Sequence, residues 1–225
     1  MKKIVLSFIS IVMLCLSGCF KTGDSIETLP PMAAFVSFDL FQPVIITQYG
    51  TFFLPTLPDD LTEGDAIWTQ FQINYDQQQP SSKYYMASEF QYYKVGKSAP
   101  METTGGMSTN DFDFPIANVA PVDRVKYNWG DYLFFVFELS SSGDKEFIYE
   151  MTYDPNEKEV VYLRAKESAS TGTHSYLYAF DMSYYYTTLP GYSDNKVSFN
   201  IMYQTGADEN QPWSGNPCVI YLNIL

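Results

Sequence analysis

The sequence predicts an all-β protein, and three features of its composition and pattern support this class. Aromatic residues dominate the apolar fraction, with 19 Tyr and 17 Phe in 225 residues, and both residue types favour strands. The 13 Gly and 13 Pro interrupt the chain at short intervals, as turns between strands do. No window shows apolar residues at the spacing of an amphipathic helix. We therefore expect short strands joined by turns.

The first residues of the chain are typical of a secretory leader. Two lysines precede an apolar run from Ile4 to Leu16, and the small pair Ser17-Gly18 leads to Cys19. The run of about 13 residues is too short to cross a bilayer of ~30 Å as a helix. The segment resembles a bacterial lipoprotein signal, which predicts a cleaved leader over 1–18, lipidation of Cys19 and attachment to a membrane.

The chain is strongly acidic, and this limits its partners. It carries 13 Lys and Arg against 26 Asp and Glu, a net charge of −13. The leader holds two lysines and no carboxylate, so its removal changes the net charge from −13 to −15. Nucleic acid binding draws much of its affinity from Lys and Arg that neutralise phosphates. We therefore expect no nucleic acid partner.

Cysteine usage indicates that packing alone stabilises the fold. Cys15 leaves with the leader and Cys19 carries the lipid, so Cys218 is left alone and the mature monomer forms no internal disulfide. Cys218 begins the apolar run that ends at Leu225. We expect it to be a small buried hydrophobic residue.

The N-terminal half begins with a predicted tether over 19–31, which contains Pro30-Pro31. Strand-like segments follow, and the alternation is clearest from Ala66 to Tyr75, where Ile67, Thr69, Phe71 and Ile73 share one face and Trp68, Gln70, Gln72 and Asn74 the other. The expected strands are Met32–Phe38, Val44–Gln48, Thr51–Leu54, Ala66–Tyr75 and Tyr84–Tyr93.

The apolar spacing disappears from Ser98 to Asp113, a stretch rich in Gly, Thr, Ser and Asn. We place a domain boundary there. Seven further strands with turn signals between them predict a β-sandwich or a small barrel. They are Arg124–Tyr127, Tyr132–Leu139, Phe147–Tyr153, Val160–Ala165, Tyr176–Asp181, Val197–Tyr203 and Val219–Ile224.

Four stretches carry a resemblance to a known family: Leu61–Phe71 (LTEGDAIWTQF), Tyr127–Leu133 (YNWGDYL), Phe180–Tyr185 (FDMSYY) and Val197–Ile201 (VSFNI). With the lipoprotein signal they resemble the NigD-like lipoproteins of the Bacteroidota over nearly the whole chain. The resemblance implies an OB-like barrel over 32–113, a β-sandwich over 114–225 and no established activity. The family name derives from a bacteriocin-associated locus.

The chain differs from many members of that family just after Cys19. Asp24 and Glu27 are isolated there, whereas a dense acidic cluster at this place directs such lipoproteins to the cell surface. The resemblance therefore implies a lipoprotein of the outer membrane that faces the periplasm.

Residue types that perform catalysis are present without a recognisable arrangement. His174 is the only histidine and lies in the turn STGTHS, and no Gly-x-Ser-x-Gly elbow accompanies it. The pairs Asp59-Asp60 and Asp111-x-Asp113 belong to polar loops, where solvated carboxylates are expected. Asp59, Asp60, Glu63 and Asp65 lack the spacing and central Gly of a calcium loop. We expect no cofactor, no metal and no catalytic residue.

Paired tyrosines give a stronger indication of function. Consecutive residues of a strand point to opposite faces, so one ring of each pair must face outward when the other is buried. Exposed aromatic side chains bind sugars, peptides or protein partners. The candidate binding residues are Tyr84, Tyr85, Tyr92, Tyr93, Tyr184, Tyr185 and Tyr186.

These observations favour an envelope-anchored lipoprotein that acts as a non-catalytic binding or assembly module, with a glycan, a peptide or an envelope protein as its partner. Two alternatives stay open. One is a glycan hydrolase that uses loop carboxylates, which two acidic side chains facing each other in a concave pocket would favour. The other is an immunity or regulatory role beside a bacteriocin system.

We expect the mature protein to begin with an acylated Cys19, because the leader ends at a lipoprotein cleavage signal. Mass spectrometry of the purified N-terminal peptide should show the acyl groups. Cys19→Ala should give an unprocessed or soluble product. An unmodified terminus further along the chain would contradict the prediction.

Overall fold

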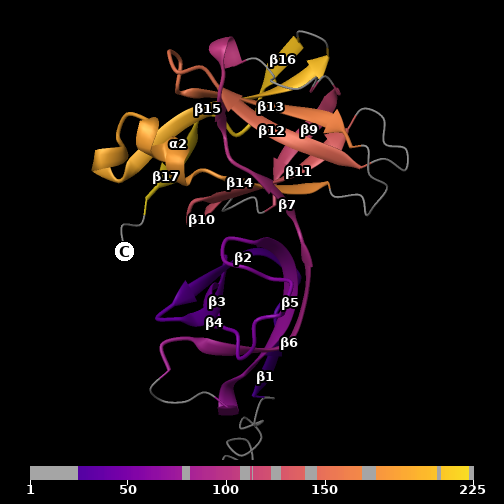
Figure 1. The fold of residues 1–225 in the computed structure, drawn as a ribbon, viewed down its shortest axis with the longest axis vertical. Coiled ribbons are helices and arrows are strands. Elements are labelled where there is room, and N and C mark those ends of the chain that lie inside the picture. Colours follow the sequence, from indigo (N-terminus) through magenta and orange to yellow (C-terminus); the bar gives the residue numbers. More distant parts are fainter. Residues whose placement is uncertain are drawn as a thin grey trace, which may run out of the picture.

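The structure is a computed structural model that describes residues 25–77, 82–106, 112, 114–122, 128–139, 146–168, 176–206 and 209–222. Within these ranges the protein is all-β, as predicted, with one short α-helix (Figure 1). The predicted leader and Cys19 lie outside the described residues. Among the described residues, no helix has the length and apolar content that crossing a bilayer requires.

Five strands of the N-terminal half close into a barrel. They pair in the order β5-β2-β3-β4-β6, and β6 returns to pair with β5. Neighbours are antiparallel except β4 and β6, which are parallel. This connectivity is that of an OB-like barrel, which confirms the predicted fold. The strands are β2 (Met32–Asp39), β3 (Gln42–Thr47), β4 (Gly50–Phe53), β5 (Ala66–Asn74) and β6 (Tyr85–Lys94).

The inward-facing side chains of β5 form part of the barrel core. Ile67, Thr69, Phe71 and Ile73 are buried, while Trp68, Gln70 and Gln72 between them are half-exposed. Phe71 packs edge-to-face against Phe52 of β4, with ring centroids 4.9 Å apart. The predicted period of two is therefore confirmed in this strand.

A bulge in β6 changes which of its side chains face outward. The pairing with β5 shifts by one residue between Gln70 and Gln72, and Glu89 has a left-handed backbone with φ 49°. One additional residue of β6 is accommodated there. As a result Ala87 points into the barrel before the bulge, whereas Gln91 and Tyr93 face outward after it.

Part of the predicted tether belongs to the barrel sheet instead. Strand β1 (Ile26–Thr28) pairs antiparallel with the end of β5, and Leu29 is buried in the barrel core. The backbone N–H of Tyr75 donates to Ser25 O at 2.7 Å. The tether prediction is thus wrong for 26–29, because an exposed three-residue strand has no periodic pattern to reveal it.

The change from barrel to sandwich occurs near Val95, earlier than the predicted stretch 98–113. Strand β7 (Gly96–Ser98) pairs parallel with β14, and β8 (Met101–Glu102) pairs parallel with β12. Residues 96–102 therefore belong to the sheets of the C-terminal half and not to the barrel. The two segments connect the halves by pairing with both sheets of the sandwich.

The C-terminal half consists of two sheets that share one large core. The first joins β7, β14 (Leu177–Asp181), β11 (Tyr132–Leu139), β10 (Asn128–Trp129) and β9 (Ile116–Pro121). The second joins β8, β12 (Phe147–Tyr153), β13 (Val160–Glu167), β15 (Lys196–Gly206), β16 (Glu209–Pro212) and β17 (Cys218–Tyr221). Short 3-10 turns lie at Tyr75–Gln77, Thr104–Gly106 and Tyr192–Asp194.

Aromatic side chains join the two sheets of the sandwich. Phe137 of β11 stacks on Tyr149 of β12, with ring centroids 3.9 Å apart and planes at 18°. Trp213 packs edge-on against Phe135, and its indole N–H donates to Val119 O at 3.1 Å. Cys218 is fully buried in the same core, as predicted. The expected β-sandwich is confirmed.

Most strands predicted in this half are present. Tyr132–Leu139 and Phe147–Tyr153 match β11 and β12 residue for residue. The sheets also contain strands that were not predicted, which are β7, β8, β9, β10 and β16. The strand expected at Arg124–Tyr127 lies outside the described residues.

The triple tyrosine Tyr184-Tyr185-Tyr186 lies in helix α2 (Ser183–Thr188), so the prediction of a strand there is wrong. The backbone N–H of Ser183 donates to the Asp181 carboxylate at 3.1 Å, which fixes the turn that begins the helix. Tyr184 is 69% exposed, whereas Tyr185 and Tyr186 belong to the sandwich core. Packing of these two rings favours a helix over the strand preference of tyrosine.

We expect Tyr185→Ala to lower the free energy of unfolding by about 3–5 kcal/mol, because it removes a buried ring from a packed core. That ring contacts Tyr153 and Phe199, and its hydroxyl donates to Lys158 O at 2.5 Å. Tyr184→Ala on the same helix should change stability by less than about 0.5 kcal/mol. Equal effects in urea unfolding would contradict the assignment of faces.

Candidate functional site

The barrel and the sandwich share a hydrophobic cluster at their junction. Phe35 of β2 stacks on Tyr132 of β11, with ring centroids 4.8 Å apart and planes at 27°. Gly130 has φ +59°, and a Cβ atom there would lie 3.0 Å from Phe35 Cζ. A glycine is therefore needed where the sandwich approaches this ring. The cluster contains Ala33, Phe35, Ala66 and Val95 of the barrel segment and Tyr132, Phe134, Leu177 and Ala179 of the sandwich.

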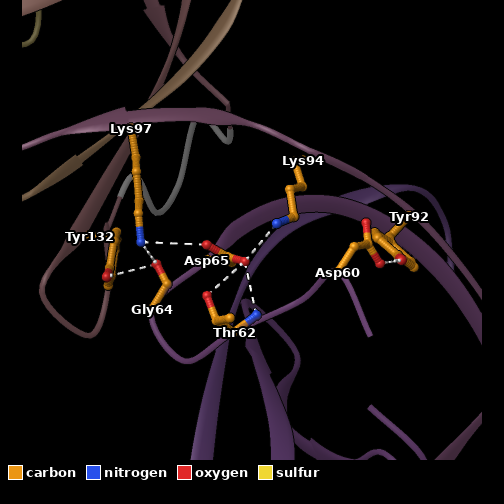
Figure 2. A network of polar contacts seen from close by, with 8 residues as sticks. All are labelled: Asp60, Thr62, Gly64, Asp65, Tyr92, Lys94, Lys97 and Tyr132. Carbon is orange, nitrogen blue, oxygen red and sulfur yellow. Dashed lines mark hydrogen bonds and ion pairs between the residues drawn. The ribbon is translucent and has the colours of Figure 1, made fainter. Parts of the chain in front are cut away.

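A polar network surrounds this cluster at Asp65 (Figure 2). The Asp65 carboxylate accepts hydrogen bonds from the backbone N–H and the hydroxyl of Thr62, at 2.9 and 3.1 Å. Lys94 Nζ lies 3.0 Å from the same carboxylate, and Lys97 Nζ lies 3.7 Å from it. The loop that precedes β5 is thereby held against the segment that enters the sandwich.

Gly64 O is the point where both halves meet in this network. It accepts hydrogen bonds from Tyr132 Oη at 3.0 Å and from Lys97 Nζ at 2.5 Å (Figure 2). Burial, with Asp181 nearby, raises the pKa of Tyr132 to about 12. The hydroxyl therefore remains a proton donor at neutral pH, which suits a structural contact.

Two carboxylates lie close to Tyr132 on the sandwich side. Burial raises the pKa of Asp131, and the negative charge of Asp181 raises it further. The Asp131 backbone carbonyl accepts from the N–H of Met182, and the Asp181 carboxylate accepts from that of Ser183. These contacts place the start of helix α2 beside the junction. No cluster of three or more His, Cys, Asp or Glu side chains suited to a metal ion occurs within the described ranges.

The outer surface of β5 and β6 combines aromatic rings with side-chain amides. Trp68 lies directly opposite Tyr93, and Gln70 lies directly opposite Gln91. Side chains of directly opposed residues share a face, with Cβ atoms about 5 Å apart. Tyr93 and Gln91 are exposed, and Trp68, Gln70 and Gln72 are half-exposed. We call these five residues, none of which carries a charge, the β5–β6 face.

The rigidity of this face comes from the residues behind it. Trp68 packs partly against the junction cluster. Thr69, its neighbour on the inner side, is buried and donates a hydrogen bond to Gln91 O at 2.7 Å. Partial burial raises the pKa of Tyr93, whose ring is still 57% exposed. The Trp68 ring and the backbone of β6 at Gln91 are therefore held in place before any ligand binds.

The remaining candidate tyrosines of β6 fall in different places. Tyr92 packs on the barrel core, stacks on Phe90 and donates a hydrogen bond to Asp60 (Figure 2). Tyr84 donates a hydrogen bond to Asp39 at 2.8 Å. Tyr85 is 45% exposed and packs edge-on against Tyr75. Of the candidates in this strand, Tyr93 alone belongs to the β5–β6 face.

The carboxylates considered for catalysis or calcium binding are separated by their contacts. Asp60 accepts from Tyr92, and Asp65 is bound by Thr62 and Lys94. Asp111, Asp113 and His174 lie outside the described residues. A groove of about 840 Å³ lies elsewhere, between the turn 155–160 and the end of α2 at 188–190.

Sequence reasoning placed the residues of the β5–β6 face only in part. The alternation in β5 predicted a shared face for Trp68, Gln70 and Gln72, which the structure confirms. Their pairing with Gln91 and Tyr93 was missed, because the bulge at Glu89 sets the register. A second feature was also missed: the exposed pair Leu40-Phe41 in the turn between β2 and β3. Two bulky apolar residues next to Asp39 are its only sequence signal.

Comparison with known proteins supports the fold and gives no activity. No protein-family model and no curated protein matches the chain. A protein of unknown function from Bacteroides vulgatus is similar in structure, with TM-score 0.52, 14% identity, and coverage of 85% of this chain and 94% of that one. A candidate lipoprotein from Bacteroides fragilis has TM-score 0.52 and 11% identity over 88% of this chain and 100% of that one.

The two-part fold is shared with these Bacteroides proteins. The solved structures that resemble this chain also include a NigD-like immunity protein from Bacteroides caccae, with TM-score 0.49, 12% identity, and coverage of 87% of this chain and 97% of that one.

We expect Asp65 to make stability depend on pH. Partial burial alone would raise its pKa, but hydrogen bonds from Thr62 and Lys94 outweigh burial and lower it. The contribution is therefore complete above the unfolded-state pKa of about 3.9 and is lost as pH falls through the folded-state value. Asp65→Asn should be less stable than wild type at neutral pH and lose less stability between about pH 5 and 3.

Urea unfolding at a series of pH values measures this difference. Asp194→Asn, in an exposed turn, controls for the loss of one negative charge. Parallel curves for wild type and Asp65→Asn would contradict the role given to the Asp65 network.

Proposed function

We propose that the protein is an envelope-anchored lipoprotein that acts as a non-catalytic binding module, and that its β5–β6 face binds a neutral glycan. The lipoprotein signal before Cys19 supports the anchor. The likeness to a candidate lipoprotein from Bacteroides fragilis is compatible with an envelope location. By the resemblance in sequence, the protein would face the periplasm from the outer membrane.

The observation that carries the binding proposal is the pairing of Trp68 with Tyr93 beside Gln70 and Gln91. Aromatic rings offer apolar surface to the C–H side of a sugar ring. Side-chain amides both donate and accept hydrogen bonds, so they can bind a sugar hydroxyl that acts as acceptor or as donor. A face without charged side chains favours a neutral ligand over an ionic one.

Charge argues against a nucleic acid on the same surface. Between 32 and 97 the chain has Lys83, Lys94 and Lys97 as its basic residues, against seven carboxylates. All three lysines already pair with carboxylates: Lys83 contacts Asp39, and Lys94 and Lys97 contact Asp65. A single-stranded nucleic acid requires a basic groove in addition to stacking rings. The aromatic residues alone do not supply this.

The hydrolase alternative would need two facing carboxylates with room for a sugar between them. Asp131 and Asp181 are a candidate pair, because the negative charge of Asp181 adds to burial in raising the pKa of Asp131. Contacts with backbone N–H groups at the start of α2 engage both residues. Removing either carboxylate would abolish hydrolysis if this alternative were correct. A peptide or an envelope protein on the β5–β6 face is the other alternative to a glycan.

We expect a glycan array with the purified protein to detect neutral oligosaccharides. For each ligand found, Tyr93→Ala and the double variant Gln70→Ala/Gln91→Ala should each weaken binding about 10-fold, the loss of roughly 1.4 kcal/mol. Tyr184→Ala serves as the matched control, because it removes another exposed tyrosine from the other half. Its affinity should equal that of wild type.

Three outcomes would contradict the proposal. One is binding that Tyr93→Ala leaves unchanged. Another is turnover of an oligosaccharide that Asp131→Asn or Asp181→Asn abolishes. The third is micromolar binding of a labelled single-stranded oligonucleotide at about 20 mM salt that weakens as salt rises, measured by fluorescence anisotropy.

A further inference from the structure

The turn between β2 and β3 has an unfavourable sequence for its backbone. Asp39 pairs with Gln42, so the turn consists of the two residues Leu40 and Phe41. Both have left-handed backbones, with φ 48° and 68°. Such turns normally contain Asn and Gly, because bulky side chains are strained at positive φ.

The same two side chains are almost completely in water. Leu40 is 86% exposed and Phe41 is 98% exposed, so neither contributes to the core. Phe38, just before them in β2, is also exposed. The backbone is strained, and the apolar side chains bury no surface in the core. Both facts indicate that these residues have a role other than folding.

Contacts connect this tip to the start of the described chain. Asp39 accepts hydrogen bonds from Lys83 Nζ at 2.9 Å and from Tyr84 Oη at 2.8 Å. Tyr85, the next residue, packs against Tyr75 with ring centroids 5.2 Å apart, and the Tyr75 N–H donates to Ser25 O. The tip thus lies beside the start of β6, next to the part of the barrel that holds Tyr75 and Ser25.

Chain length places this part of the barrel near the membrane. Six residues separate Ser25 from Cys19, which corresponds to at most roughly 20 Å of extended chain. Exposed Ile26, Tyr75 and Tyr85 surround the point where the chain leaves the barrel. Tyrosine is enriched where proteins meet the membrane–water interface.

The charges near the tip also suit a lipid surface. Asp39 is paired with Lys83, and hydrogen bonds from Lys83 and Tyr84 lower the pKa of its carboxyl. The turn residues themselves are uncharged. The apolar side chains can therefore enter the interface without carrying an unpaired charge with them.

The geometry points to a second contact with the membrane: the Leu40-Phe41 tip enters the lipid interface beside the acyl anchor. This inference rests on the proposed lipidation of Cys19. It gives the barrel two attachment points, one through the acylated Cys19 and one through the tip. The anchored protein then has one preferred orientation on the bilayer.

Site-specific fluorescence on the full acylated protein tests this contact. The protein is reconstituted in vesicles of phosphatidylcholine and phosphatidylethanolamine, with Phe41→Cys labelled by an environment-sensitive dye. Cys218 is buried and does not compete for the label. We expect a blue-shifted emission and strong quenching by lipids brominated in their acyl chains. The same dye at Tyr184→Cys, in the other half, should show neither.

Replacing the pair by the residues that the turn prefers separates lipid contact from folding. Leu40→Asn/Phe41→Gly should leave the melting temperature unchanged or raise it, because the backbone strain is relieved. A dye at Gln42→Cys should lose its quenching by brominated lipid in this background. The lipid anchor itself stays intact.

Each result decides the matter. A dye at position 41 that stays in water while the acylated protein remains on vesicles overturns the tip contact and leaves the proposed function intact. A blue-shifted emission in native membranes but not in the lipid vesicles would assign the tip to an envelope protein instead. A lower melting temperature for the Asn-Gly variant would assign the pair to folding. Protein without acyl groups would overturn both the anchor and the contact.

Discussion

The stack of Phe35 on Tyr132 joins two β units that would otherwise be connected only by a single chain segment. Around it, the side chains of the junction cluster exclude water, and Gly64 O of the barrel accepts hydrogen bonds from Tyr132 and Lys97 of the sandwich. Buried apolar area at such a contact contributes about 25 cal/mol per Å². The β5–β6 face and the Leu40-Phe41 tip consequently keep a fixed direction with respect to the sandwich.

Long strands with clear alternation could be predicted from the sequence, and short or tertiary-dependent elements could not. Strands β5 and β13 alternate between buried and half-exposed residues along most of their length, so their pattern is local. Strands β7 and β8 contain three and two residues and depend on parallel partners far along the chain. Helix α2 was mistaken for a strand, because tyrosine favours strands and its burial at 185 and 186 is a tertiary effect.

The candidate site also depends on tertiary pairing that the sequence pattern does not reveal. Alternation identifies the outward residues of β5 correctly, but the partners on β6 depend on one additional residue at Glu89. A shift of one residue exchanges the two faces of a strand. Without the bulge, Tyr93 and Ala87 would face the same side. The sequence has no glycine there to reveal it, so only the structure brings Tyr93 beside Trp68.

The early position of β7 and β8 in the chain affects the order in which the protein can fold. The barrel is complete once Val95 is available, because all its strands precede that residue. By contrast, β7 and β8 must wait for β14 and β12, and the core is closed only when β17 pairs with β15. A chain that emerges N-terminus first therefore presents β8 without a partner until β12 has emerged, and β7 without a partner until β14 has. Such open edges readily pair with other chains, so this interval is when the protein would benefit most from a holding chaperone.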